Sequence, residues 1–306
     1  MKKVIHYSLL AVRVSCITVY FLFPGTHVFA QRDSLATQLN ELLSFKGYFS
    51  SLGDNFAKQA SSPFHLHPRG CIETAVIISS TLILTTIDGN ADDEVKNLKT
   101  ENSFINDVNP VVTELGGTYG IAGACTFGLA GIIFKNNKVA ETGLLATQAI
   151  ITSGLWVTAG KYLSGRERPL RSYESSGLPG GKWYGLFTEI SNPSNLPSSS
   201  FNSFPSGHTS TAFAIATVFA MQYKNCKAVP LTVYTIAAVV GASRMIEQKH
   251  WLSDVFAGAA LGHLCARQIM NSYFVSKGKS ADRNRAHIFI VPDFSFAPSA
   301  KAVVIF

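Results

Sequence analysis

The sequence predicts an all-α fold, a bundle of six or more helices. Hydrophobic residues make up 47% of the 306 residues and charged residues only 15%, which is too apolar for a disordered chain. Apolar segments recur along the chain, each longer than a usual strand, and in several of them Ala and Gly outnumber β-branched residues. The predicted helices are Thr74–Ile87, Leu115–Phe134, Thr142–Gly160, Thr209–Tyr223, Ala228–Ser243 and Val255–Ala266.

Residues 1–30 are typical of a signal peptide, which predicts an exported, periplasmic protein. Lys2 and Lys3 precede an apolar run from Val4 to Phe23, and residues 28–30 resemble a cleavage site. An uncleaved membrane anchor is the alternative, because the run approaches the ~20 residues that span a bilayer. The formal net charge of +7 includes the basic residues of this segment. No polybasic run follows, so no nucleic-acid partner is expected.

The rest of the chain divides into three parts by polarity. We predict an N-terminal extension over residues 31–70, partly helical through the amphipathic stretch Leu35–Phe45, a helical domain over 71–272 and a polar tail over 273–306. Within the tail, the apolar segments Ile288–Val291 and Ala302–Phe306 could pair as a small hairpin or lie along the bundle.

Two uncharged windows leave open whether the bundle lies in water or in lipid. Leu115–Phe134 and Thr142–Gly160 are long enough to span a bilayer. Gln148 and Thr152 dilute the second window, and a central helix of a soluble bundle is apolar all round as well. The sequence favours a soluble or peripheral bundle, with a membrane-embedded one as the alternative. The first window also contains six glycines, which suits close approach between helix backbones.

A polar stretch, Asp88–Asn109, interrupts the apolar pattern. The acidic spacing that begins at Asp88 mimics the start of a calcium-binding EF-hand loop. However, Asp93 and Lys99 stand where that loop requires Gly and Glu. We therefore expect a solvated helix-capping loop here, without a metal.

The cysteines do not predict a metal site. No Cys-x-x-Cys or Cys/His ligand spacing is present, so no zinc is expected. An exported protein can form disulfides, and the four cysteines beyond the signal allow three pairings. Cys125 and Cys265 lie in apolar stretches where buried free thiols are common, so the pairing stays open.

Three clusters carry the candidate chemistry. In the first, an apolar helix is predicted to end near Lys161, and Arg166 and Arg168 follow within eight residues. Pro169 discourages Arg168 from continuing the helix, and Gly165 lets the chain turn. Such a terminus can direct Lys161 and Arg168 at one point, although cations at a helix end are also common without a function.

The second cluster is Pro-Ser-Gly-His at residues 205–208, directly before the predicted helix Thr209–Tyr223. Free N–H groups at such a helix start attract an anion. Ser206 adds a hydroxyl donor beside Gly207, and His208 can supply a proton near neutral pH. An ordinary helix start is the alternative explanation.

The third cluster is Ser243-Arg244, followed by His250 and Asp254. His250 and Asp254 are four residues apart, so they share one face of a helix. A carboxylate bonded to one ring nitrogen of His250 would leave the other nitrogen nucleophilic. A surface His–Asp pair without a catalytic role is the alternative.

Together the clusters describe one chemistry at helix ends. Lys161, Arg168 and Arg244, with the amides near Gly207, would surround a tetrahedral dianion. His250 would attack phosphorus and His208 would protonate the departing oxygen, without need of a metal.

The order K-x6-R-P, P-S-G-H and S-R-x5-H-x3-D resembles the signature of the type 2 phosphatidic acid phosphatase (PAP2)/vanadium haloperoxidase superfamily. The resemblance implies a helical core and a phosphohistidine at His250, which Asp254 orients and His208 assists as general acid. It also implies that the phosphoryl group is held by Lys161, Arg168, Ser206, Gly207 and Arg244. Family members include secreted acid phosphatases and membrane lipid phosphatases, both facing the extracytoplasmic side.

These features predict a metal-independent phosphatase of phosphate monoesters, without a cofactor and inhibited by vanadate. The first alternative is a membrane-embedded phosphatase of phosphatidate, a polyprenyl diphosphate or the phosphates of lipid A. The others are a vanadate-dependent haloperoxidase and a non-catalytic binding bundle. The long stretch Leu170–Phe204, with Trp183 and Tyr184, is expected to form a lid that shapes the leaving-group pocket. Neither the leaving group nor the oligomeric state follows from the sequence.

Overall fold

A computed structural model describes most of the chain beyond its N-terminal segment. The described residues are 42–65, 68–101, 103–175, 177, 179–186, 198–283, 287–293 and 299–305. The predicted signal peptide and most of the amphipathic stretch Leu35–Phe45 lie outside them.

The described chain is almost entirely helical, which confirms the predicted fold class. In order, the elements are α3 (Phe45–Ser61), η1 (Ser62–Phe64), α4 (Pro68–Glu101), α5 (Ser103–Glu114), α6 (Thr118–Ile133), α7 (Asn137–Ser164), α8 (Pro169–Ser175), η2 (Ser198–Phe201), α9 (Gly207–Gln222), α10 (Ala228–Ile246), α11 (Leu252–Arg283), β1 (His287–Asp293) and β2 (Ser299–Ile305). The strands β1 and β2 pair antiparallel, so the tail forms the hairpin that was one of its two expected arrangements.

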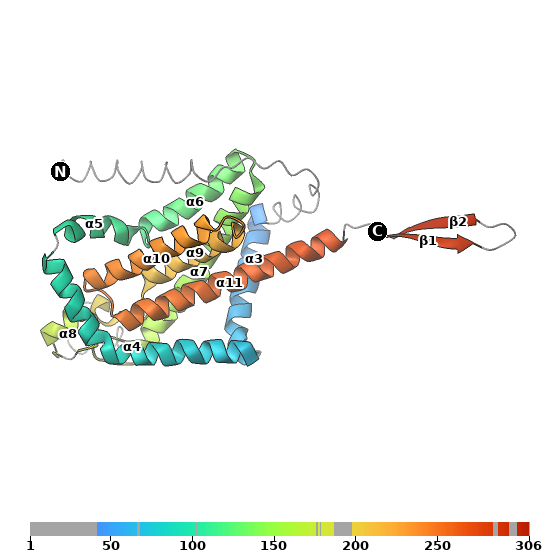
Figure 1. Cartoon of the computed structure of the whole chain (residues 1–306). Coiled ribbons are helices and arrows are strands. Elements are labelled where there is room, and N and C mark those ends of the chain that lie inside the picture. Colours follow the sequence, from blue (N-terminus) through green and yellow to red (C-terminus); the bar gives the residue numbers. More distant parts are fainter. Residues whose placement is uncertain are drawn as a thin grey trace.

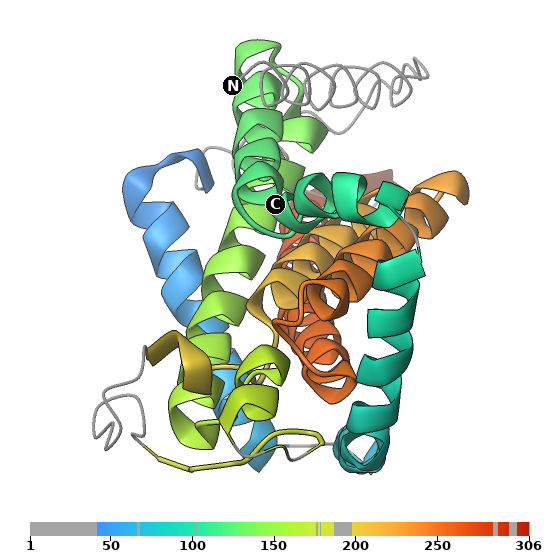
Figure 2. The ribbon, with the colours of Figure 1, turned by 90° about the vertical axis from the view of Figure 1, so that its left-hand side faces the viewer.

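The helix α9 forms the centre of the bundle and packs against α7, α10 and α11 (Figure 1). Its buried side chains are mostly small, including Ala212, Ala214, Ala216 and Ala220. Small side chains let neighbouring helices approach closely, so the core is built from many short contacts. In the end-on view, α3 and α4 lie on opposite sides of these central helices (Figure 2).

One expectation about the helices was wrong. The stretch Asp88–Asn109 is not a solvated loop, because it forms the end of α4 and the start of α5, with Asp88 and Asp92 buried. The helix α11 continues to Arg283, past the predicted boundary at residue 272. The stretch Leu170–Phe204 contributes to α8 and η2 near its two ends.

Glycines bring the backbones of α6 and α7 together, as the six-glycine window predicted. A Cβ atom on Gly143 would lie 2.2 Å from the Cα of Gly128, and one on Gly131 would lie 2.1 Å from the backbone nitrogen of Ala140. No side chain fits in such a contact, so these positions fix how closely the two helices pack.

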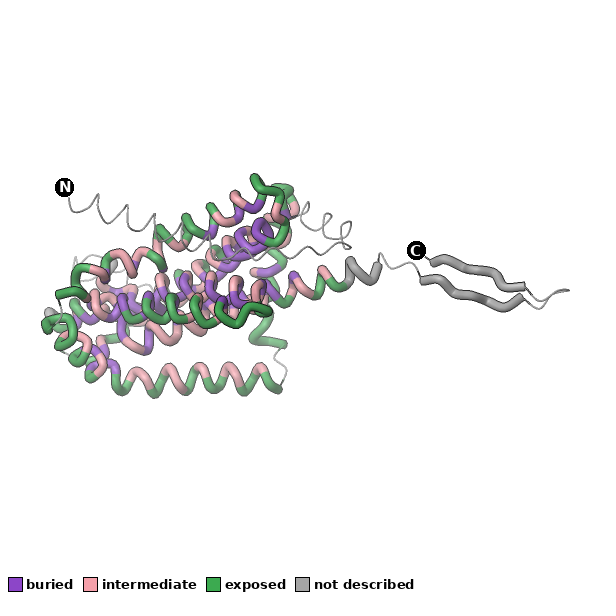
Figure 3. The backbone as a smooth tube through the Cα atoms, turned by 45° about the horizontal axis from the view of Figure 1, so that its top comes forward, coloured by how far each residue is buried: buried purple, intermediate pink, exposed green. Residues whose placement is uncertain are grey.

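The described helices include two that are long and apolar enough to cross a membrane, α4 and α10. The pair α5 and α6, bent by 45° at the break between them, would make a third if it forms one span. The window Thr142–Gly160 lies instead in α7, where Gln148, Thr152 and Ser153 are buried inside the bundle. In α4 the pattern is reversed, since most of its apolar side chains are exposed (Figure 3).

The α6–α7 contact predicts a specific packing defect. We expect Gly143→Ala to destabilise the protein by roughly 1–3 kcal/mol, because the new methyl group would force the two backbones apart. The thermal unfolding midpoint of the purified protein in detergent measures this effect.

Gly154→Ala in the same helix is the matched control. A Cβ atom there meets nothing within 4 Å, so alanine should leave stability unchanged or raise it slightly. Equal midpoints for the two variants would contradict the proposed close approach.

Candidate active site at the helix ends

The end of α7 and the loop after it position the first cluster. Gly165 ends α7 in the left-handed region, with φ 53°, and its N–H donates to the carbonyl of Lys161. Pro169 begins α8, so Arg168 stands between two helices. Its N–H donates to the carbonyl of Ser200 and its Nε donates to Asn202 at 3.0 Å. The loop before α9 therefore holds Arg168 in place.

The second cluster forms the start of α9 and is anchored against α11. Ser206 precedes the first helical residue, Gly207, and is fully buried. Its backbone N–H donates to the carbonyl of Asp254 at 3.0 Å, and its hydroxyl bonds that of Thr209 at 2.8 Å. A Cβ atom on Gly258 would lie 2.4 Å from the carbonyl oxygen of Ser206. The helix start is thus held tightly, with its first N–H groups available for an anion.

His250 lies in the loop between α10 and α11 and is 2% exposed. Its Nδ1 lies 2.6 Å from the carbonyl oxygen of Ser203, which can only accept a hydrogen bond. The proton is therefore assigned to Nδ1, and Nε2 keeps its lone pair. The Oδ2 atom of Asp254 lies 3.7 Å from Nδ1, beyond hydrogen-bond distance. Asp254 thus acts on the ring by its charge, while Ser203 makes the direct contact.

Burial lowers the pKa of His250 to about 3, and the charges of Arg168 and Lys161 contribute, against the raising effect of Asp254. The imidazole is therefore neutral at physiological pH, which is the form a nucleophile requires.

His208 lies in the first turn of α9, under the bend between α5 and α6. A Cβ atom on Gly117 would lie 2.9 Å from its Nε2, so the ring of His208 packs directly against the backbone of Gly117. The pKa of His208 is lowered to about 4, mainly by burial. The positive charge of Arg244 also lowers it, and that of Lys161 does so more weakly. Lys161 therefore lies close enough to both imidazoles to lower the pKa of each.

Arg244, at the end of α10, is held by one of its terminal nitrogens. Its Nη1 donates to Glu247 at 2.5 Å and contacts the hydroxyl of Thr113 at 3.4 Å. Its Nε is buried and has no partner among the described residues. An unpaired buried donor is costly, so this nitrogen is suited to a ligand oxygen. The predicted site residues thus come together as cations, amides and two neutral imidazoles, which can bind a tetrahedral anion.

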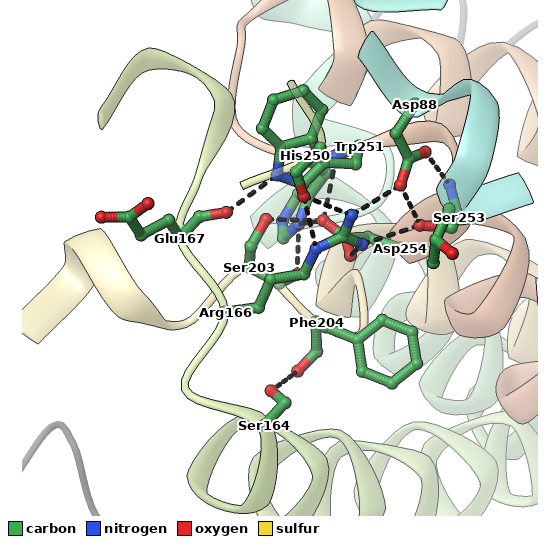
Figure 4. Close-up of polar contacts among 12 residues, drawn as sticks. Asp88, Ser164, Arg166, Glu167, Ser203, Phe204, His250, Trp251, Ser253 and Asp254 are labelled. Carbon is green, nitrogen blue, oxygen red and sulfur yellow. Dashed lines mark hydrogen bonds and ion pairs between the residues drawn. The ribbon is translucent and has the colours of Figure 1, made fainter. Parts of the chain in front are cut away.

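Sequence reasoning missed the residue at the centre of the polar contacts, Arg166 (Figure 4). It is fully buried and donates to Asp254 Oδ1 and to Asp88 Oδ2, both at 2.5 Å. It also donates to the hydroxyl of Ser253 at 2.7 Å. Arg166 stood within the first cluster, but no local signal linked it to Asp88, 78 residues earlier in the chain. Ser203 was missed for the same reason.

The aromatic residues of the predicted lid line a separate hollow beside α7. Trp183, Tyr184 and Phe204 border a hollow of about 520 Å³ with Gly160 and Leu163. Tyr184 donates to the buried carboxylate of Glu167 at 3.0 Å, so this part of the stretch is ordered.

A further histidine, His263, and four cysteines of the described part of the chain lie outside the three clusters. His263 is half-buried, and its Nδ1 contacts the hydroxyls of Thr217 and Tyr234 at 3.0 and 3.2 Å. Cys71, Cys125, Cys226 and Cys265 are free thiols, of which only Cys265 is buried.

The chain is similar to three known proteins. A segment of 64 residues, 21% of this chain, is 48% identical to a protein named lipid A 1-phosphatase from Porphyromonas gingivalis, of which it covers 14%. The crystal structure of Aquifex aeolicus LpxE aligns with a TM-score of 0.42 and 21% identity, over 62% of this chain and 94% of that one. A PAP2-type phosphatidylglycerolphosphate phosphatase from Bacillus subtilis aligns with a TM-score of 0.45 and 23% identity, over 69% and 97%.

The family model of the PAP2 superfamily matches residues 142–277, which run from α7 through most of α11. This segment contains all three clusters and the helices that position them. Over residues 142–277 the chain is therefore similar to the PAP2 superfamily.

Proposed function

We propose that the protein is a metal-independent phosphatase, embedded in a membrane, that hydrolyses a phosphate monoester of a lipid through a phosphohistidine at His250. The observation that carries this proposal is the contact between Nδ1 of His250 and the carbonyl of Ser203. It leaves Nε2 as a neutral nucleophile near Lys161 and Arg168, whose charges lower the pKa of the ring.

In the first step, Nε2 of His250 attacks phosphorus while the bond from phosphorus to the ester oxygen breaks. His208 donates a proton to that oxygen, so the alcohol leaves uncharged. Lys161, Arg168 and Arg244, with the N–H groups at the start of α9, hold the phosphoryl oxygens as negative charge shifts between them. The phosphorylated ring is cationic, and the Ser203 carbonyl and the nearby Asp254 carboxylate stabilise it.

In the second step, neutral His208 takes a proton from water and the water oxygen attacks phosphorus. The phosphorus–nitrogen bond breaks, phosphate leaves, and His208 is again protonated. Three cations and helix amides supply the positive charge, so no metal takes part in either step.

His208 must be protonated before the first step, although its pKa in the empty site is about 4. A bound dianion adds two negative charges beside the ring and raises this pKa. The binding of the substrate thus favours the protonated form that a general acid requires.

A lipid substrate is supported by the surroundings of the site. A cavity of about 590 Å³ lies between α4 and the bundle, with almost entirely apolar walls; its lining is Ser80, Ile83, Leu84, Phe213, Ala238, Gly241, Leu252, Val255, Phe256 and Ala259. Leu252 and Val255 flank the buried polar pair Ser253 and Asp254. An acyl chain in this cavity would therefore end close to the loop between α10 and α11 that carries His250.

The span-length helices α4 and α10 border the same cavity. We therefore propose the membrane-embedded form in place of the soluble or peripheral bundle that the sequence favoured. The site would face the extracytoplasmic side, in keeping with the predicted export signal. The named activity of the Porphyromonas gingivalis relative supports a lipid phosphate of the lipid A type as the substrate.

We expect His250→Ala to lower kcat for phosphate release at least ~10³-fold, because the attacking nitrogen is lost. Release of phosphate from a lipid phosphate in mixed micelles measures the effect. Vanadate should inhibit the wild type and a chelator should not.

His65→Ala is the control for this experiment. His65 is an exposed histidine whose ring contacts only the carbonyl of Ser61 among the described residues, so its loss should leave kcat unchanged. Normal turnover in His250→Ala would rule out the covalent mechanism.

Filling the apolar cavity should separate lipid from soluble substrates. We expect Ala238→Trp to raise KM for a lipid phosphate by roughly fivefold or more, on the order of 1 kcal/mol. KM for p-nitrophenyl phosphate should not change, because that substrate has no acyl chain. Val239→Trp, exposed on the next position of α10 and outside the cavity lining, is the matched control. Equal effects on both substrates would contradict an acyl-chain role.

The proton linkage at His208 predicts how anion affinity changes with pH. Because a dianion raises the pKa of His208 above its empty-site value of about 4, sulfate should bind more tightly as pH falls below the raised pKa. The gain is at most about tenfold per pH unit and should level off near pH 4. Calorimetric titration of sulfate from pH 8 to 4 measures it. The dependence should disappear in His208→Gln, and its persistence there would assign it to another group.

A further inference from the structure

The membrane-span candidate α4 carries two carboxylates on its inner side. Within α4, a helix of 34 residues that the structure describes in full, only Asp88, Gly89 and Asp92 are buried. Apolar side chains such as Ile72 and Leu82 are more than half exposed. A helix that directs carboxylates inward and leucines outward needs a positive partner inside the protein, since a buried charge without one is very costly.

Asp88 finds its first partner at the start of α11. Its Oδ1 accepts the backbone N–H of Ser253 at 2.9 Å, and its Oδ2 accepts the hydroxyl of the same residue at 2.5 Å. The first N–H groups of a helix have no partner within the helix. Asp88 therefore caps α11 from another helix, one residue before Asp254.

The second partner of Asp88 is Arg166, whose guanidinium connects the two aspartates. Nη2 of Arg166 donates to Asp88 and Nη1 donates to Asp254, each at 2.5 Å. The carbonyl of Gly180 accepts from Nη2 at 2.7 Å. The guanidinium also lies 4.5 Å from the ring centre of Trp183. Hydrogen bonds and this aromatic contact thus hold the guanidinium between the two aspartates.

The contacts continue from Asp254 to the proposed nucleophile (Figure 4). Oδ2 of Asp254 accepts the hydroxyl of Ser203 at 2.5 Å and the N–H of Trp251 at 2.9 Å. The carbonyl of Ser203 then contacts Nδ1 of His250 at 2.6 Å. An unbroken series of buried hydrogen bonds thus runs from α4 to the imidazole.

We infer that Asp88 is a positioning residue, which fixes His250 for attack by holding Arg166, Asp254 and Ser203 in one arrangement. The inference rests on the proposed function, since it assigns Asp88 a part in the same reaction. Asp88 lies outside the segment that the family model matches, residues 142–277. With this role for Asp88, α4 would help to position His250 and would also line the apolar cavity.

The test replaces one carboxylate of α4 by an amide. In Asp88→Asn, Arg166 loses one of its two anionic partners and is free to move toward Asp254. We expect kcat to fall roughly tenfold or more, while the affinity for inorganic phosphate changes less than about threefold. A purely structural role would lower the amount of folded enzyme without this difference between kcat and phosphate affinity.

Asp93→Asn is the matched control, because Asp93 is on the same helix with a side chain 68% exposed. Its replacement should leave kcat unchanged. Arg166→Lys keeps the positive charge but cannot reach both aspartates with separate nitrogens, so it should lower kcat as Asp88→Asn does.

The double variant of Asp88→Asn and Arg166→Lys decides whether the two residues act as one unit. If they do, kcat of the double variant should equal that of the less active single variant. If the residues act independently, the fold-decrease in kcat should be the product of the two single fold-decreases. If Asp88→Asn does not fold, Arg166→Lys is judged by the same kcat and phosphate criteria.

The outcomes separate this inference from the proposed function. A wild-type protein without phosphatase turnover would overturn the proposed function itself. If the wild type is active and kcat of folded Asp88→Asn lies within twofold of that of Asp93→Asn, only the positioning role is overturned.

Discussion

The structure depends on one buried guanidinium that pairs with two carboxylates from distant parts of the chain. Arg166 follows α7, Asp88 belongs to α4 and Asp254 to the first turn of α11. Each charge is fully buried, so the removal of one partner leaves the others uncompensated, at a cost on the order of 3–5 kcal/mol. This mutual dependence fixes the three segments relative to each other. The loop that carries His250 is positioned by that arrangement.

The sequence predicted the helices because their signals are local. Apolar segments rich in Ala and Gly correspond to α6, α7, α9 and α10, and the glycine-rich window is the place where two backbones touch. The positions of Lys161 and Ser206 at helix ends were also predictable. Gly165 ends one helix in a left-handed conformation and Gly207 begins another, which are preferences of individual residues.

The role of Asp88 was not predictable, because it depends on the solvent around α4. In water an aspartate on an apolar helix is expected at the surface, and the acidic run after Ile87 indicated a loop. Around a lipid-facing helix the preference is reversed, since the apolar side chains face outward and the carboxylates face the protein. The same sequence is compatible with an aspartate that faces water and with one that faces the protein interior. The partner that decides between them is 78 residues away.

The spacing of His250 and Asp254 predicted a shared helix face and a carboxylate bonded to the ring, whereas His250 precedes α11 and the Ser203 carbonyl makes that bond. This geometry keeps the proposed nucleophile neutral. A carboxylate in direct contact with an imidazole favours the imidazolium, which cannot attack phosphorus. Here the Ser203 carbonyl takes the direct position, and Asp254 stays 3.7 Å away. Arg166 also neutralises part of the charge of Asp254, while Lys161 and Arg168 lower the pKa of the ring. In the proposed mechanism, the same carboxylate is near enough to stabilise the ring once it carries phosphorus and becomes cationic. Arg166 would then let one aspartate serve both states of His250, because it weakens the negative field before attack without removing it.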